Sequence, residues 1–124
     1  MKKTIVAVVL AAMSGGVWAE WVKMSEIDEA VTYLDPATIR RDRSLRRVWE
    51  LYDLKVRAKG GEMSRRAFSE YDCKEERFRM LSNTAHSGPM AAGETLSAWN
   101  TPGEWIYIAP GTLAEYALKY VCAR

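Results

Sequence analysis

The sequence is poor in the side chains that build most catalytic and metal centres, because its 124 residues include one histidine and two cysteines. A tetrahedral zinc site needs three or four ligands, and if both cysteines are committed to a disulfide, His86 would have only carboxylates to help it. A catalytic triad needs partners that face the histidine in space, which the neighbouring Ser87 does not provide. Gly60 and Gly61 lack the Lys-Ser or Lys-Thr of a phosphate-binding loop. We therefore predict no metal, no cofactor and no enzymatic activity.

Long hydrophobic runs are also scarce. The one apolar run, Thr4–Met13, has about half of the roughly 20 residues that a membrane-spanning helix needs. Lys2 and Lys3 precede it, and small residues stand at the end of this segment, which is typical of a secretory signal peptide. We predict a signal peptide over residues 1–19 and one domain over residues 20–124.

Glu20 would be the first residue after cleavage, at the place where a bacterial lipoprotein has a cysteine. The sequence thus predicts an exported protein, periplasmic or secreted, with no membrane span after signal cleavage. It offers no lipid anchor for surface display.

A charge excess of one sign is absent as well. Removing residues 1–19 removes two of the 18 basic residues and none of the 16 acidic ones, so the remaining chain has 16 of each. A neutral chain lacks the overall positive field of a nucleic-acid-binding protein, and we predict no nucleic-acid partner.

Basic residues do gather locally between positions 40 and 47, where Asp42 is the only acid. Arginine binds carboxylate, sulfate and phosphate groups in a bidentate manner, so the stretch is a candidate ligand-binding site. The alternative is a solvated polar turn that leads into a strand. The candidate residues are Arg40, Arg41, Arg43, Arg46 and Arg47. Arg65 and Arg66 would add to the site if their strand lies beside it.

Carboxylates offer a weaker argument for catalysis. Asp72, Glu75 and Glu76 cluster in the sequence, and a suitably spaced pair could act on a glycan. Basic residues interleave with them, however, and mixed charges of this kind more often form ion pairs on a solvated sheet face.

Strand patterns fill most of the domain, separated by turn signals. The expected strands are 21–24, 31–34, 45–56, 65–73, 76–84, 95–99 and 105–108. Asp35-Pro36 predicts one helical turn through Ile39, and residues 40–44 read as a polar turn. Pro102-Gly103 indicates a hairpin between the last two strands.

The pattern becomes helical near the end of the chain. Thr112 and Glu115 match a capping box, and apolar residues recur at helical spacing, which predicts a helix over about 113–121. Helical crossovers between the strands are missing, so the sheet should be antiparallel. We predict an α+β fold with about five or six antiparallel strands and the C-terminal helix packed on one face.

Cys73 and Cys122 are the two cysteines. Export would place them in an oxidising compartment, which favours a disulfide over a metal site or a reactive thiol. Closing a loop of this length is worth about 4 kcal/mol in the chain-entropy model.

Several separated stretches together resemble the bacterial surface-adhesin protein E family over nearly all of residues 21–122. They are Trp21-Val22-Lys23, Tyr33-Leu34-Asp35-Pro36, Ile39-Arg40, Arg47-Val48-Trp49-Glu50-Leu51, Glu70-Tyr71-Asp72-Cys73-Lys74-Glu75-Glu76-Arg77, Ser87-Gly88-Pro89-Met90, Gly93, Trp105, Pro110-Gly111-Thr112 and Val121-Cys122. The resemblance implies an antiparallel sheet, a packed C-terminal helix and a disulfide between the two cysteines.

The resemblance also implies a binding module for cell adhesion, whose partners would be host extracellular-matrix or plasma proteins such as laminin and vitronectin. The alternative is a periplasmic structural or stress-related protein with no host ligand. A small hydrolase is the third class, and it would need two facing carboxylates or a histidine beside a serine and an acid.

Overall fold

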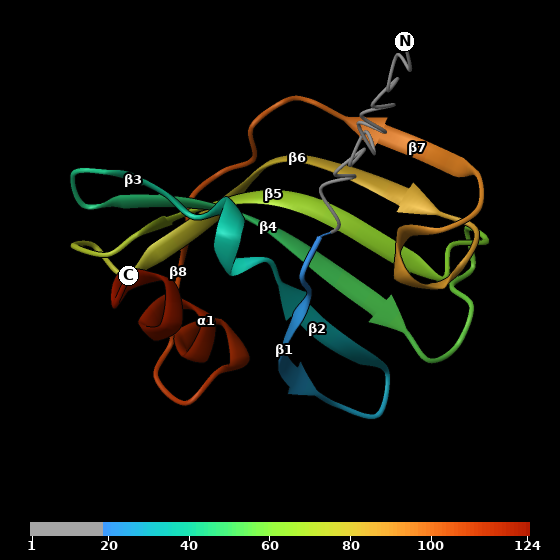
Figure 1. The fold of residues 1–124 in the computed structure, drawn as a ribbon, viewed down its shortest axis with the longest axis horizontal. Coiled ribbons are helices and arrows are strands. Elements are labelled where there is room, and N and C mark those ends of the chain that lie inside the picture. Colours follow the sequence, from blue (N-terminus) through green and yellow to red (C-terminus); the bar gives the residue numbers. More distant parts are fainter. Residues whose placement is uncertain (1–18) are drawn as a thin grey trace, which may run out of the picture.

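The computed structural model describes residues 19–124, so the predicted signal peptide, apart from Ala19, lies outside the described residues. One antiparallel sheet forms most of the fold, and its main path runs β1-β2-β4-β5-β6-β7 (Figure 1). The six strands of that path are β1 (Val22–Glu26), β2 (Ala30–Leu34), β4 (Leu45–Leu54), β5 (Ser64–Asp72), β6 (Arg77–His86) and β7 (Thr95–Trp99). Two short strands join it, β3 (Arg40–Asp42) on β4 and β8 (Ile106–Tyr107) on β6. The predicted antiparallel α+β fold is confirmed.

The segment that joins β2 to β4 was predicted correctly in part. Asp35 caps the short 3₁₀ turn η1 (Pro36–Thr38) by accepting a hydrogen bond from the amide of Ala37 at 3.1 Å. The polar turn expected over residues 40–44 is wrong, because Arg40–Asp42 pair with β4 and the turn is only Arg43-Ser44. Three charged residues look like a loop in sequence, but an edge strand with exposed side chains accommodates them as well.

The hairpin predicted around Pro102-Gly103 is also wrong. Strands β7 and β8 do not pair with each other; both pair with β6, β7 near His86 and β8 near Arg77. The connection between them runs along the edge of β6, where the amide of Gly103 donates to the carbonyl of Met80 at 2.8 Å. Turn residues marked the change of direction, but they could not show which strand would supply the partner.

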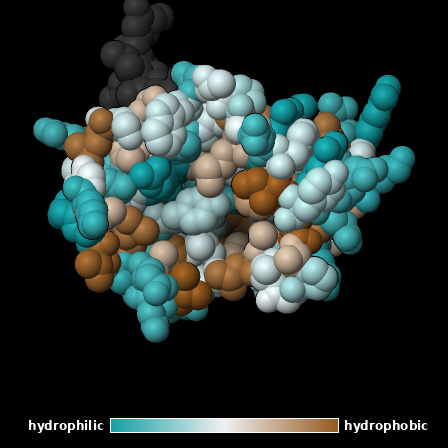
Figure 2. All heavy atoms as spheres, turned by 180° about the vertical axis from the view of Figure 1, so that it is seen from behind, coloured by the Kyte–Doolittle hydropathy of each residue, from teal (hydrophilic) through white to brown (hydrophobic). Residues whose placement is uncertain are grey.

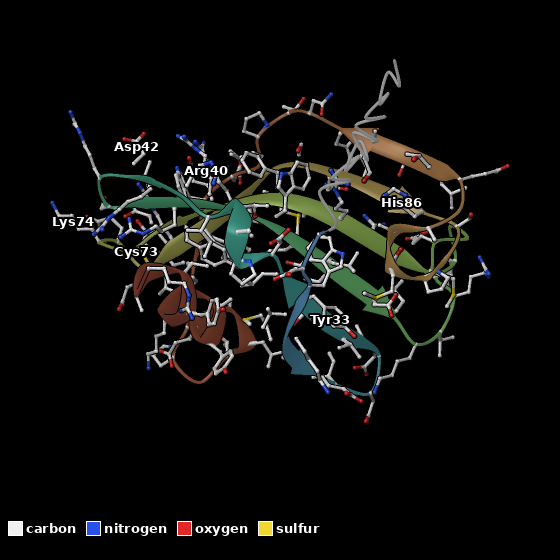
Figure 3. The ribbon with its side chains drawn as sticks, in the orientation of Figure 1. Tyr33, Arg40, Asp42, Cys73, Lys74 and His86 are labelled. Carbon is white, nitrogen blue, oxygen red and sulfur yellow. A yellow bond between two sulfur atoms is a disulfide. The ribbon has the colours of Figure 1, made fainter. Side chains whose placement is uncertain are left out.

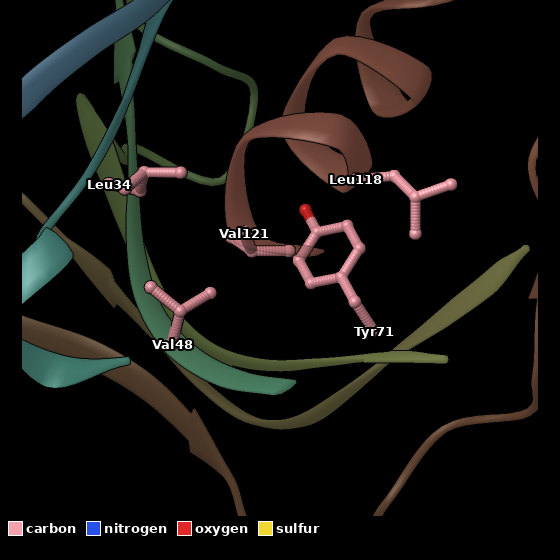
Figure 4. Packing of buried hydrophobic residues seen from close by; sticks show 5 residues of the cluster. All are labelled: Leu34, Val48, Tyr71, Leu118 and Val121. Atoms are coloured by element: carbon pink, nitrogen blue, oxygen red, sulfur yellow. The ribbon is translucent and has the colours of Figure 1, made fainter. Parts of the chain in front are cut away.

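The C-terminal helix α1 (Leu113–Cys122) packs on one face of the sheet, as predicted. Thr112 caps it by accepting from the amide of Glu115 at 3.3 Å. Leu118 and Val121 point from the helix into the core, where they meet side chains of β2, β4 and β5 (Figure 4). The five buried residues of this core are Leu34, Val48, Tyr71, Leu118 and Val121.

A disulfide joins Cys73, directly after β5, to Cys122 at the end of α1. Their Cα atoms are 5.8 Å apart. The bond confirms the prediction, and it fixes the end of the helix to the sheet that the helix covers. In residues 19–124 no helix has the length and hydrophobicity needed to cross a membrane.

Candidate functional site

Three of the five candidate arginines project from the β3–β4 hairpin. Arg40, Arg41 and Arg43 are exposed, and none of them forms an ion pair with a carboxylate of residues 19–124. Arg40 donates to the carbonyls of Ala37 and Ile39, at 3.2 and 3.3 Å. Figure 3 shows Arg40 and Asp42 at one end of the sheet, near Lys74. These three guanidinium groups are therefore available to an anionic partner.

The other two candidates lie on opposite faces of β4, because successive strand residues alternate. Arg46 is 4% exposed, and it donates to the main-chain oxygens of Arg124 at 3.1 Å and Arg43 at 2.9 Å. Burial, and then the nearby charge of Arg41, lower the pKa of Arg46. Arg46 thus holds the hairpin against the end of the chain.

Arg47 points to the open face, away from α1, and takes part in a network around Glu70. The Nε of Arg47 donates to Oε2 of Glu70 at 2.7 Å, and the Nε of Arg79 donates to Oε1 at 2.9 Å. Glu70 is 1% exposed. A cross-strand row of Arg40, Arg47, Glu70 and Arg79 results, since these residues are register partners on β3, β4, β5 and β6.

A second row lies beside the first. The guanidinium of Arg77 donates to Asp72 at 3.0 Å. The same guanidinium lies 4.5 Å from the ring centre of Trp105, and the guanidinium of Arg79 lies 4.4 Å from that ring centre. An open depression of about 580 Å³ separates this group from the hairpin turn; Arg43, Asp72 and Trp105 contribute to its walls. This end of the open face thus brings together arginine and tryptophan, two residue types that are enriched at protein interfaces.

Arg65 and Arg66 do not join the hairpin. Their strand does neighbour β4, but they pair with Tyr52 and Leu51 at its far end. Arg66 is four residues from Glu70, about 13 Å along the strand, and it lies 4.3 Å from the ring centre of Trp49. Arg65 forms an ion pair with Glu62 at 2.7 Å.

The carboxylates that could have suggested catalysis have structural roles or stay exposed. Burial by itself would raise the pKa of Asp72, but the amides of Glu75 and Lys74 and the guanidinium of Arg77 together hold this pKa below its ordinary value. These two amides donate to Oδ1 of Asp72 at 3.1 Å, which shapes the turn after β5. Glu75 and Glu76 are exposed.

His86 ends β6 and is buried, rather than lying in a loop. It forms a hydrogen bond of 2.7 Å with the hydroxyl of Thr84. Burial, and then the charge of Arg66, lower its pKa. The hydroxyl of Ser87 accepts from the amide of Glu94, so this serine is part of the loop structure. Across the described part of the chain, no group of three or more potential metal ligands occurs.

Glu50 is the residue that the sequence analysis missed. It is 5% exposed and lies on the helix-covered face of β4. Tyr71 donates to its Oε1, while Tyr52 and Ser69 donate to Oε2 at 2.9 and 3.2 Å. Burial raises the pKa of Glu50. A glutamate at an inward position of a strand, two residues after the buried Val48, was the available signal.

Comparison with known proteins agrees with this architecture. The family model described as surface-adhesin protein E matches residues 21–123. Crystal form II of Haemophilus influenzae protein E is 14% identical, with a TM-score of 0.62 over 82% of this chain and 96% of that chain. The selenomethionine form gives 13% identity and a TM-score of 0.62 over 81% and 90%. Protein E from non-typeable Haemophilus influenzae gives 14% and 0.58 over 82% and 75%. No curated protein sequence matches the chain. At such low identity the structural likeness shows the fold alone.

Proposed function

The chain belongs to the surface-adhesin protein E family, and on that premise we propose that it is an exported binding module that contributes to adhesion by binding host extracellular-matrix or plasma proteins. Laminin and vitronectin represent the kind of partner meant. The observation that carries the proposal is the β3–β4 hairpin, which presents three exposed arginines with no carboxylate partner in residues 19–124. The proposed role is binding and not catalysis.

Local charge makes the hairpin suited to an acidic partner even though the chain beyond residue 19 is neutral overall. Arg40, Arg41 and Arg43 can each offer a planar donor pair to a carboxylate or sulfate. Arg46 and Arg47 would act indirectly, because the first anchors the turn and the second holds the Glu70 network. Attraction through exposed charges is screened over roughly 8 Å at physiological salt, so binding should weaken as salt rises.

Binding of purified protein to immobilised laminin and vitronectin tests the proposal, with the triple variant Arg40→Ser, Arg41→Ser and Arg43→Ser. We expect salt-sensitive binding that falls at least about tenfold in the variant, because each charge-assisted contact is worth more than a neutral one. The matched control replaces Lys55, Arg57 and Lys59 with Ser, which removes the same charge from the exposed loop after β4. Equal loss in both variants, or salt-insensitive binding, would contradict the hairpin as the site.

Adhesion also requires that the protein leave the cytoplasm and reach the cell surface. The export proposal rests on the N-terminal pattern of residues 1–19. Cell fractionation combined with protease treatment of intact cells distinguishes display on the cell surface from retention in the periplasm. Protein that is cleaved on intact cells supports adhesion, whereas protein found only in a protected periplasmic fraction supports a periplasmic structural or stress-related role.

A further inference from the structure

A cavity of about 320 Å³ lies between the first turns of α1 and the sheet. Its walls are mainly hydrophobic, with Ala114 and Ala117 from the helix and Met24 from β1. Ile27 and Leu113 also line it and are 42% and 47% exposed, so they extend from the cavity to solvent. A hollow with hydrophobic residues beside it is visible near the centre of Figure 2. Small-molecule sites are typically apolar hollows of this kind with a few converging polar groups.

Among residues 19–124, Glu50 contributes the one carboxyl group in the lining, and these residues do not fill all of its acceptor positions. An ionised carboxylate offers about four acceptor positions on its two oxygens. Tyr52 and Ser69 donate to Oε2, and Tyr71 is the only donor to Oε1 among the residues that the structure describes. One acceptor position on Oε1 therefore remains for a further donor.

The described residues provide no ion-pair partner for this carboxyl group. None of the lysines, arginines or histidine in residues 19–124 forms an ion pair with Glu50. The groups that donate to it are neutral hydroxyls, and burial raises its pKa. A buried carboxylate without a counter-charge is costly, so a cation that entered the cavity would gain a strong partner.

Aromatic rings complete the surroundings of Glu50. Tyr52, Tyr71 and Phe78 all line the cavity, and the rings of Tyr71 and Phe78 are stacked with centres 5.8 Å apart. Aromatic faces attract ammonium groups, and the attraction strengthens when water is excluded. Carboxylate, aromatic rings and hydrophobic walls together match a molecule with a cationic head and an apolar body.

We propose that this cavity is a binding site for a primary alkylammonium ion, whose ammonium group donates to Oε1 of Glu50 while its alkyl chain lies against Ala114, Ala117 and Met24. The site is separate from the arginine hairpin, and the proposal does not depend on host-protein binding. The ammonium group would be held by charge and by the open acceptor position. The alkyl chain would displace water from the hydrophobic walls, which favours binding in proportion to the apolar surface that is buried.

Titration of the purified protein with hexylammonium and with 1-hexanol, followed by NMR and calorimetry, tests the proposal. We expect hexylammonium to bind at least about tenfold more tightly than hexanol, because the two have the same chain and differ in charge. Ligand protons should show contacts to the methyl groups of Ala114 and Ala117. Absence of saturable binding, or equal affinity for the two probes, would overturn the proposal.

Two variants locate the site. Glu50→Gln removes the charge and keeps the side-chain shape, so it should abolish the preference for hexylammonium and leave hexanol binding unchanged. Ala117→Phe places a large side chain in the cavity while leaving Glu50 in the sequence, and it should abolish binding of both probes. Glu70→Gln is the matched control, because it neutralises a buried glutamate on the other face and should leave the preference intact. If Glu50→Gln does not fold, the proposal is still tested by binding of the two probes to the unaltered chain and to Ala117→Phe. A preference for hexylammonium over hexanol that persists in Ala117→Phe would overturn the proposal.

Discussion

Glu50 and Glu70 are both buried, they lie on neighbouring strands, and their surroundings are opposite in character. Glu70 lies on the open face, where Arg47 and Arg79 approach its two oxygens at 2.7 and 2.9 Å. Glu50 lies on the face that α1 covers, where its partners are the hydroxyls of Tyr52, Tyr71 and Ser69. One carboxylate is thus neutralised by charge and the other is only solvated by neutral donors.

The location of the helix explains the difference. The side chains of Arg47 and Arg79 remain 36% and 30% exposed, so their guanidinium groups reach Glu70 without leaving water entirely. Beside Glu50, under the first turn of α1, an arginine would lose that hydration, and burying a charge is expensive even in a pair. Hydroxyl groups can be buried at a much lower cost when they find partners. The network around Glu50 therefore contains no cation from residues 19–124, and Arg46, the buried arginine on this face of β4, donates instead to the main-chain carbonyls of Arg124 and Arg43.

The largest effect on stability is expected from breaking the disulfide, because this bond holds α1 on the face that contains Glu50. Cys122→Ser removes the disulfide that ties the end of α1 to Cys73. We expect the free energy of unfolding to fall by about 4 kcal/mol in the chain-entropy model. Urea and thermal unfolding measure the loss, and faster amide hydrogen exchange in α1 than in β6 would show that the helix-covered face is affected first.

The double variant Cys73→Ser with Cys122→Ser is the control, because it removes the bond without leaving a free thiol. The two variants should unfold alike. Unchanged stability in either, or two reactive thiols in the native protein, would contradict the structural role given to the bond.

A smaller effect is expected on the open face. Glu70→Gln leaves Arg47 and Arg79 with a neutral partner on a side chain that is almost fully buried. We expect a loss of about 1–3 kcal/mol, the usual range when hydrogen-bonded groups lose a partner, because both arginines can still turn toward water. Urea unfolding gives the value. The control Glu75→Gln changes an exposed carboxylate in the turn after β5 and should stay within about 0.5 kcal/mol; an equal loss in both variants would contradict the assigned role of Glu70.

Residue patterns were sufficient to predict the elements of the fold but not which strands pair with one another. The alternation in β4 and β5, the capping box at Thr112 and the two cysteines predicted the sheet, the helix and the disulfide. Pairing partners were harder, because exposed arginines in β3 look like a turn, and nothing local could show that β7 and β8 both pair with β6. Arg46 and Arg47 are sequence neighbours with similar charge, and only the fold separates them onto two faces.

Glu50 shows the same limit at the level of a site. Its position on an inward-facing part of β4 could be inferred from alternation, but its partners Tyr52, Ser69 and Tyr71 come from two strands. The cavity beside it depends on where α1 begins relative to β1. Neither relation follows from local pattern, because each is set by tertiary packing.

The smallest effect on stability is expected at Glu50 itself, and its pH dependence shows which form of the group the fold tolerates. Burial raises the pKa of Glu50 in the folded chain, so the unfolded chain loses this proton at a lower pH than the folded chain does. The contribution of Glu50 to the free energy of unfolding is therefore fully present below the ordinary glutamate pKa. It is lost as the pH rises through the raised pKa of the folded chain. The glutamine of Glu50→Gln is neutral at every pH. The stability of this variant relative to the unaltered protein should therefore increase as the pH rises from the ordinary pKa to the raised pKa. A tenfold difference in proton affinity corresponds to about 1.4 kcal/mol. Urea unfolding of both proteins at a series of pH values measures the difference, in which the other titrating groups largely cancel. A difference that is flat with pH, or that falls as pH rises, would mean that Glu50 is ionised at no cost and that its hydroxyl partners solvate it as well as water does.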